Sequence, residues 1–282
     1  MKFKKVAIFG VGLIGGSVGL ALKKRQMAEQ VIGVGRRQES LENAKTLGII
    51  DTYTLKVAEG FADAELIILA APVNAVLELL ETGLAFLKDH RIITDVCSSK
   101  KVVVESAEKA LPSHLSFIGG HPIAGSEKNG AESASADLFV DRVTVLTPTA
   151  KTQLPDFERI QTLWESLGSK VFSLTPDEHD RVLAVTSHIP HLLAVSASLL
   201  VEQAEIPNKE NFIGPGFRDL TRIAEGEPSL WQHIFLTNSD HILENLTRLE
   251  KIIYEWKDAL KKNDLEHLLK LLNSASQFRK NL

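Results

Sequence analysis

Short apolar runs alternate with segments of helical period along the first part of the chain. The apolar runs, which are typical of strands buried on both faces of a sheet, lie at 5–9, 31–35, 64–71, 91–94 and 115–118. The segments with helical spacing lie at 17–25, at 38–47 and from Pro72 onward. This order predicts an α/β fold, a Rossmann-type domain whose parallel sheet is covered by helices. Two further strands, at 143–147 and 170–173, are expected to extend the sheet at one edge.

The pattern changes at Thr175. Thr175, Pro176 and Glu178 form a capping box with proline at the first helical position. Nearly all of the chain after this point has helical period. We therefore predict two domains: a dinucleotide-binding Rossmann domain at 1–174 and an all-helical substrate and dimerisation domain at 175–282.

The helical region carries a heptad seam of apolar residues. With alternating spacings of four and three, the seam consists of Ile242, Leu246, Leu249, Ile253, Trp256 and Leu260. Such a seam packs either inside its own domain or against a second copy of the chain, and we expect a homodimer. Elsewhere in this region, Pro190 is expected to kink its helix and Asn263 to cap the last helix.

The first strand runs directly into a glycine-rich turn. Gly10, Gly12 and Gly15 fit the pattern G-x-G-x-x-G between a strand and a helix, with Leu13 and Ile14 inside it. Glycines permit a tight turn and a close approach of the backbone to a pyrophosphate, which then sits at the helix N-terminus. The pattern predicts a dinucleotide site. The alternative is a glycine-tolerant helix start without a ligand.

The end of the second strand indicates which dinucleotide binds. NAD sites carry a carboxylate there, but this chain has Gly35 followed by Arg36 and Arg37. Guanidinium groups bind a 2′-phosphate, whereas a carboxylate would repel it, so we predict NADP, with NAD as the alternative. The arginines could also merely stack on adenine. Ala71 and Pro72, where the third apolar run ends, are expected to contact the cofactor as well.

Polar clusters follow two later strands, at 95–100 and 119–130. Ligands of such sheets bind beyond the carboxyl ends of the strands, so His121 in the second cluster is a candidate general base. Its alternative is an ordinary surface histidine. In the helical region, Ser187 and His191 are four residues apart and share a helix face. Histidines there lack an identified third ligand, so no metal site is predicted.

Composition narrows the class of protein. The 282 residues carry a formal net charge of -4, which leaves no basic footprint for nucleic acid. Cys97 is the only cysteine, so no disulfide forms within the chain, which fits the cytoplasm. The apolar run at 6–22 follows three lysines but contains regularly placed glycines and no convincing cleavage site. We therefore expect a cytoplasmic protein with no membrane segment.

Taken together, five motifs in order resemble the prephenate/arogenate dehydrogenase family over nearly the whole chain. The motifs span residues 10–17, 95–100, 120–127, 187–191 and 216–224. The resemblance implies an NAD(P)-dependent enzyme of tyrosine biosynthesis that oxidatively decarboxylates prephenate to 4-hydroxyphenylpyruvate. It also implies a Rossmann domain followed by a helical domain that dimerises.

The resemblance further implies roles for individual residues. His121 would take the proton of the substrate's ring hydroxyl, Ser98 would help hold that hydroxyl, and Arg222 would bind a substrate carboxylate. The other positions that match substrate-side or pocket-shaping residues of the family are Ser187, His191, Glu127, Asp219 and Trp231.

Several alternatives remain at this point. Gly35 departs from the family's common aspartate, which puts NAD in doubt. Histidines and arginines near the expected pocket favour prephenate, but arogenate or both acids could be the substrate. A different Rossmann-plus-helical dehydrogenase would not be expected to share the later histidine motifs. The non-enzyme alternative is an NADP-binding sensor.

Overall fold

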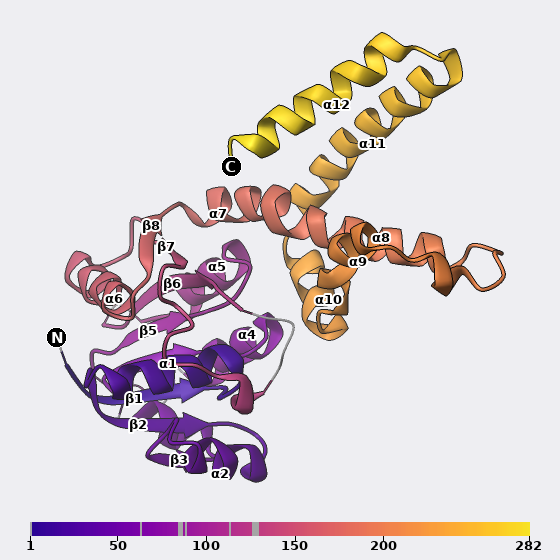
Figure 1. The fold of residues 1–282 in the computed structure, drawn as a ribbon. Coiled ribbons are helices and arrows are strands. Elements are labelled where there is room, and N and C mark those ends of the chain that lie inside the picture. The colour runs from indigo at the N-terminus through magenta and orange to yellow at the C-terminus, as the bar shows by residue number, and fades with distance from the viewer. Residues whose placement is uncertain (1, 63, 84–86, 88, 113, 126–129) are drawn as a thin grey trace.

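The computed structural model describes residues 2–282 apart from 63, 84–86, 88, 113 and 126–129. Figure 1 shows a sheet with flanking helices, followed by a helical region that extends away from it. In the described residues the strands are β1 (Phe3–Phe9), β2 (Ala28–Val34), β3 (Thr52–Thr54), β4 (Leu66–Leu69), β5 (Ile92–Asp95), β6 (Ser116–Ile123), β7 (Val143–Thr147) and β8 (Lys170–Ser173). The predicted fold class, a Rossmann-like sheet domain followed by helices, is confirmed.

All eight strands belong to one sheet in the order β3-β2-β1-β4-β5-β6-β7-β8. Neighbours pair in parallel except β6 and β7, which are antiparallel. β7 and β8 extend the sheet at one edge, as expected, and the sequence had not indicated that β7 runs antiparallel to β6. A parallel return needs a crossover, usually a helix, whereas the described part of the β6–β7 connection contains only a short 3₁₀ helix at Ala131–Ser133.

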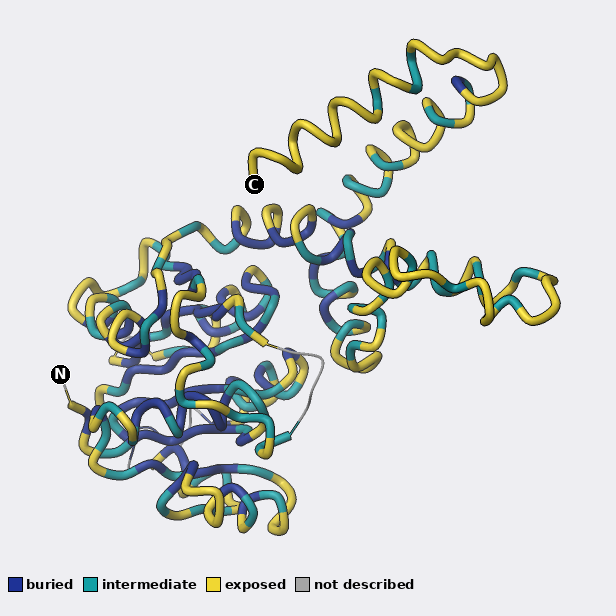
Figure 2. Tube along the Cα trace, viewed as in Figure 1, coloured by how far each residue is buried: buried dark blue, intermediate teal, exposed yellow. Residues whose placement is uncertain are grey.

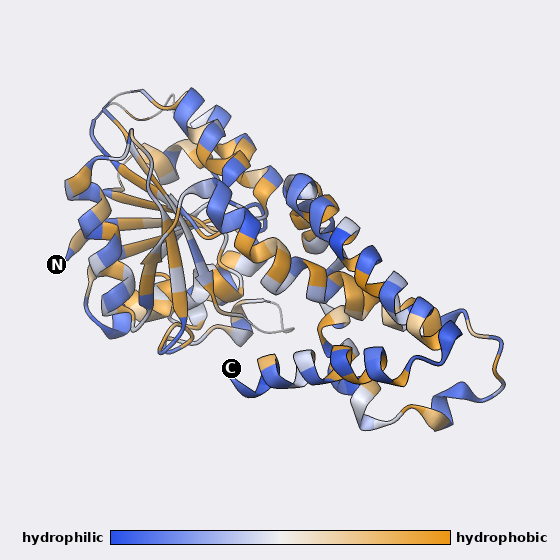
Figure 3. Cartoon of the chain, turned by 90° about the horizontal axis from the view of Figure 1, so that it is seen from above, coloured by the Kyte–Doolittle hydropathy of each residue, from blue (hydrophilic) through white to orange (hydrophobic). Residues whose placement is uncertain are grey.

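Helices cover both faces of the sheet (Figure 3). The helices of the first domain are α1 (Leu13–Lys24), α2 (Gln38–Thr46), α3 (Val57–Ala62), α4 (Val73–Gly83), α5 (Lys101–Ala110) and α6 (Leu154–Ser166). Alternate residues of β1 enter two different cores. Val6 and Ile8 pack with residues of α1, α2 and α6, while Ala7 and Phe9 pack with residues of α3, α4 and α5. Strands buried on both faces explain the unbroken apolar runs of the sequence.

The helical region begins where the capping box predicted. Thr175 accepts a hydrogen bond from the backbone of Glu178, and the Glu178 side chain accepts one in return. The α-helices that follow are α7 (Pro176–Leu183), α8 (Ile189–Glu202), α9 (Pro215–Thr221), α10 (Pro228–Thr237), α11 (Ser239–Lys262) and α12 (Leu265–Lys280). Asn263 closes α11 in the left-handed conformation, and Asp264 caps α12 through the His267 amide. The prediction that Asn263 caps the last helix was therefore wrong by one residue.

Pro190 interrupts the helix less than expected. A π-helical segment, Ala184–His188, joins α7 to α8, and the Ile189 amide donates to the carbonyl of Ala184, five residues earlier. The helical run therefore continues through Pro190 at the start of α8. The irregularity is this wider π turn before the proline, a feature often found at functional sites.

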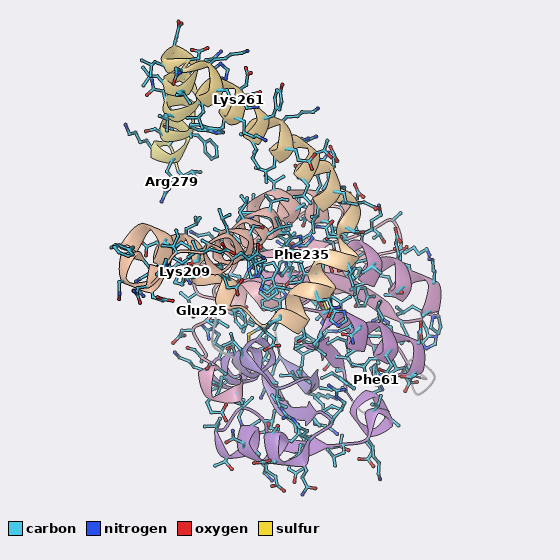
Figure 4. The ribbon with its side chains drawn as sticks, turned by 90° about the vertical axis from the view of Figure 1, so that its right-hand side faces the viewer. Phe61, Lys209, Glu225, Phe235, Lys261 and Arg279 are labelled. Atoms are coloured by element: carbon cyan, nitrogen blue, oxygen red, sulfur yellow. The ribbon has the colours of Figure 1, made fainter. Side chains whose placement is uncertain are left out.

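Most residues of the α11–α12 hairpin are exposed (Figure 2). It stands away from the other elements, with Lys261 near its tip and Arg279 near its end (Figure 4). Of the heptad seam, Ile242 is buried, and Leu246 and Leu249 pack on a small core with Ala184 and Ile189. Further along, exposed apolar side chains include Ile252, Ile253, Tyr254, Leu260, Leu265 and Leu269.

Candidate active site

The glycine-rich turn has the geometry of an anion cradle. Gly10 adopts φ +97°, and a Cβ there would lie 2.3 Å from the Ala70 carbonyl oxygen, so only glycine fits. Gly12 is the N-cap residue of α1 and faces open space within 4 Å of its Cβ position. Leu13, Ile14 and Gly15 form the first turn of α1, which carries no acidic residue. Backbone N–H groups without an acidic neighbour suit a pyrophosphate.

The other cofactor candidates lie at the ends of adjacent strands. Gly35 follows β2, and among the described residues the exposed side chains of Arg36 and Arg37 make no ion pair or hydrogen bond, although the Arg37 carbonyl accepts one from the Leu41 amide. Ala71 and Pro72 follow β4, which is hydrogen-bonded to β1. The carboxyl ends of parallel strands meet at one edge, so these residues lie along the edge that Gly10 begins.

A cavity of about 560 Å³ lies between the sheet domain and the helical region. Of the predicted substrate-side and catalytic residues, those that line it are Ser98, His121, Ser187, Arg222 and Trp231. They come from the β5–α5 loop, β6, the π segment, the stretch after α9, and α10. Residues from five separate segments thus converge on one space, which is large enough for a small ring acid.

His121 lies within β6 rather than in a glycine-rich loop beyond it. The strand continues to Ile123 because β7 pairs with it, His121 opposite Val145. The ring is 8% exposed, and its Nδ1 lies 2.8 Å from Nε2 of His179. Burial, then the neighbouring His179, Lys100 and His188, hold the pKa of His121 well below its usual value. His121 is therefore neutral at neutral pH and able to accept a proton.

A buried ion pair supports this corner of the cavity. Asp95 and Lys100 are both fully buried and bonded to each other. Lys100 Nζ also donates to the Gly120 carbonyl at 2.8 Å, and Asp95 accepts from the amides of Gly120, at 3.1 Å, and Cys97, at 2.9 Å. The pair therefore ties the loop that carries Ser98 to the strand that carries His121. Partners on all sides offset the desolvation cost of the two charges.

Two histidines from the helical region lie at the other wall. His188 lines the cavity, and its Nδ1 receives a hydrogen bond from Asn238 at 3.0 Å. Its Nε2 is buried without a partner among the described residues, as is Nδ1 of His191. His191 is not among the lining residues, because its ring is stacked on Trp231. Burial lowers the pKa of His188 to about 4, so it is a neutral donor through Nε2.

One further predicted residue, like His191, does not line the cavity. Asp219 is exposed on α9 and is not among the residues that line the cavity. Glu127 lies outside the described residues. No group of three or more histidine, cysteine or acidic side chains in the described part of the chain could hold a metal ion.

Three buried polar residues near the site were not predicted from the sequence: His179, Asp180 and Asn238. His179 and Asp180 are adjacent on α7 and fully buried, beside Leu183 on the same helix. A signal was available, since a His-Asp pair one turn before an apolar residue puts polar groups on the buried face of a helix. Burial of such groups implies partners, but the sequence alone does not identify them.

Known proteins match nearly the whole chain. The family profile for the nucleotide-binding domain of prephenate dehydrogenase matches residues 18–173, and that for its dimerization domain matches 175–274. The chain is 35% identical to prephenate dehydrogenase of Bacillus subtilis over 280 residues, covering 98% of this chain and 76% of the relative.

Two solved structures have the same fold over nearly all of both chains. Prephenate dehydrogenase from A. aeolicus, in complex with hydroxyphenyl propionate and NAD+, superposes with a TM-score of 0.94 at 31% identity, over 100% of this chain and 99% of the other. Arogenate dehydrogenase from Synechocystis superposes with a TM-score of 0.84 at 28% identity, over 98% and 99%. The chain belongs to the prephenate dehydrogenase family.

Proposed function

We propose that the protein oxidatively decarboxylates prephenate to 4-hydroxyphenylpyruvate, with hydride transfer to NAD(P)+. The observation that carries the proposal is a neutral, buried His121 in a cavity that also holds Ser98, Ser187 and Arg222. The hydride leaves C4 of the ring together with the hydroxyl proton, and the C1–carboxylate bond breaks to release CO₂. The electrons of that bond enter the ring, which becomes aromatic.

His121 is the general base of this proposal. It accepts the proton of the C4 hydroxyl as the hydride leaves, so that C4 becomes a carbonyl carbon. When CO₂ leaves, the electrons of the broken bond reach the same oxygen, which takes the proton back and becomes the phenol of the product. Ser98, half-buried on the facing loop, holds the same hydroxyl. Because both groups are anchored by the Asp95–Lys100 pair, the hydroxyl is oriented without reorganisation of the protein.

The carboxylates of the substrate need donors on the helical side of the cavity. Arg222 and Ser187 line that side, and we propose that they bind these groups. His191 would reach the keto acid end only after Trp231 moves from its ring. Glu127 and Asp219 remain proposed pocket residues on the family resemblance alone.

The glycine turn is proposed to hold the cofactor pyrophosphate, which fits the open space at Gly12 and the N-terminus of α1. When bound, the nicotinamide supplies the acceptor for the hydride. Arg36 and Arg37 carry two positive charges beside Gly35, where no carboxylate opposes a 2′-phosphate. We therefore propose NADP as the preferred cofactor, with NAD as the alternative. Ala71 and Pro72 would pack against the bound cofactor.

We further propose that the protein is a cytoplasmic homodimer. Within each chain, we place the boundary between the two domains after residue 174. The two family profiles meet between 173 and 175, which supports the boundary. The exposed apolar residues of α11 and α12 lie within the match to the dimerization domain, and we propose that a second copy of the chain covers them.

One helix of the described residues, Pro176–Glu202, is long and apolar enough to span a membrane. Its buried His179 and Asp180 fit a protein core instead.

Arogenate is the second candidate substrate, favoured by the likeness to the arogenate dehydrogenase structure. The test is the absorbance of reduced nicotinamide with each ring acid against each cofactor. We expect the highest kcat/KM with prephenate and NADP. A higher value with arogenate would reassign the substrate, and no turnover with either acid would favour the NADP sensor.

A further inference from the structure

A series of hydrogen-bonded, buried side chains connects α7 to the proposed base, His121. Asp180 is the residue of this hydrogen-bonded series that lies farthest from His121. Its carboxylate accepts hydrogen bonds from the backbone amides of Lys100, at 2.7 Å, and Lys101, at 3.0 Å. It also lies 2.7 Å from Nδ1 of His179. Two backbone N–H donors and one ring nitrogen thus surround this carboxyl group, and no oxygen of the described residues is bonded to it. Asp180 therefore acts as an acceptor only, as the ionised form does.

His179 lies between Asp180 and His121 in this series and is fully buried. Its Nδ1 faces the Asp180 carboxylate, so Nδ1 carries the proton. Burial lowers the pKa of His179, and a neutral imidazole has only one N–H, so its Nε2 is an acceptor. That Nε2 lies 2.8 Å from Nδ1 of His121.

The same assignment of one N–H to each neutral ring then determines which nitrogen of His121 carries the proton. Its Nδ1 must be the donor in the bond to His179, which leaves Nε2 with a free lone pair. His121 lines the cavity while Nδ1 is turned to His179, so Nε2 is the nitrogen that faces the substrate space. A base needs its lone pair on that side.

We propose that His179 and Asp180 are positioning residues that fix the Nδ1–H tautomer and the ring orientation of His121, leaving Nε2 as the proton acceptor. This inference rests on the proposed function, in which His121 is the base. When Nε2 accepts the proton, the positive charge on His121 is stabilised through His179 by the negative charge of Asp180. Charged or titratable groups of the described residues that act on His121 and His179 also include Lys100, Asp95 and His188.

The tautomer of His121 also depends on the contact between the sheet domain and the helical region. His121 belongs to the sheet, whereas His179 and Asp180 belong to α7, and Asn238 donates to the Asp180 carbonyl at 2.7 Å. The tautomer is therefore imposed only when α7 sits against the start of α5. A loop histidine on its own would sample both tautomers.

The direct test reads the tautomers in the unsubstituted protein with NADP bound. Nitrogen–proton correlation NMR of histidine-labelled protein separates the two neutral forms, and the spectra of His121→Asn and His179→Gln assign the signals. We expect the proton on Nδ1 of both rings. A proton on Nε2 of His121 would overturn the proposal. The measurement needs no turnover, so it stands apart from the test of the proposed function.

Kinetics of matched variants test the consequence. His179→Leu removes the acceptor for His121 and should lower kcat by roughly 100-fold, with the KM for prephenate and the Kd for NADP unchanged. His179→Gln can present an amide oxygen at the same place and should recover most of that loss. Thr237→Val, which removes the 2.8 Å bond to Ser99 at the same junction, is the control and should behave as the unaltered protein.

Two results would contradict the role of His179. One is an equal loss of kcat in His179→Leu and His179→Gln, because the hydrogen-bond acceptor would then not matter. The other is a joint change in kcat, KM and cofactor Kd that Thr237→Val reproduces, because the effect would then be loosening of the junction.

Discussion

The rings of His191 and Trp231 lie face to face, with centroids 3.5 Å apart and planes inclined by 9°. Trp231 lines the cavity and His191 does not, so the tryptophan separates His191 from the substrate space. The Nδ1 of His191 is nevertheless buried without a partner among the described residues. A buried polar atom without a partner costs free energy, which a substrate group could recover once the indole moves.

His191→Val should therefore raise the KM for prephenate more than that for arogenate. The loss of one hydrogen bond, worth about 1 kcal/mol, corresponds to roughly a fivefold change in KM. Turnover at saturation should change little, because His191 is not in contact with the proposed base. Steady-state kinetics with both acids check this, and an equal effect on the two acids would remove His191 from recognition of the keto acid.

His121→Asn should lower kcat by about two to four orders of magnitude, the usual contribution of a positioned general base. The cofactor site is built from other segments, so the Kd for NADP, measured by fluorescence titration, should stay the same. Nearly unchanged turnover would show that another group takes the proton.

Gly35→Asp should shift the cofactor preference toward NAD. A carboxylate there offers an acceptor to the ribose hydroxyl and repels a 2′-phosphate. A Cβ at this position lies 3.3 Å from the Leu41 side chain, so a small shift of that side chain admits it. Arg36→Ala should weaken NADP binding by about 1–3 kcal/mol and NAD binding less. If both cofactors lost the same affinity, the preference for NADP would be refuted.

Acid should destabilise the fold through its buried histidines. The pKa of His188 is lowered from 6.5 to about 4, so between these values the unfolded chain binds more protons than the folded one. The stability associated with neutral His188 is thus fully present above pH 6.5 and is lost as the pH falls toward 4, by about 2 kcal/mol at pH 5. The lowered pKa values of His121, His179 and His191 act in the same direction.

Urea unfolding at pH 7.5 and pH 5 measures this loss. His188→Gln lacks the titrating ring and should lose less stability between the two pH values, whereas His267→Gln on α12 should match the unaltered protein. An equal pH dependence in all three proteins would contradict the role of His188.

Ile253→Asp should disrupt the proposed dimer without damaging the core of its own chain. Ile253 is 47% exposed on α11, whereas Leu249 packs on the small core of Ala184 and Ile189, so Ile253 is the cleaner probe. We expect monomers or insoluble protein by light scattering, and an unchanged dimer for the control Leu154→Asp on α6, where the side chain is 66% exposed. A stable monomer of the unaltered chain would rule the dimer out.

Features that depend on a few neighbouring residues were predictable from the sequence. The turn from Gly10 to Gly15 and the capping box at Thr175 are local, because backbone sterics and one hydrogen bond determine each. The buried parallel strands were also predictable, since a strand covered on both faces has to be apolar throughout. The family motifs identified His121, Ser98 and Arg222 as site candidates before any geometry was known.

The tertiary structure decided what depends on partners that are distant in the sequence. The antiparallel β7 extended β6 through His121, where the sequence indicated a loop, because strand ends depend on the neighbouring strand. The chain from Asp180 through His179 to His121 joins residues 58 positions apart, and no local pattern records which buried groups will meet. The stack of Trp231 on His191 likewise arises only when α10 packs beside α8. Sequence periodicity specifies which face of an element is buried, and the fold alone specifies what that face touches.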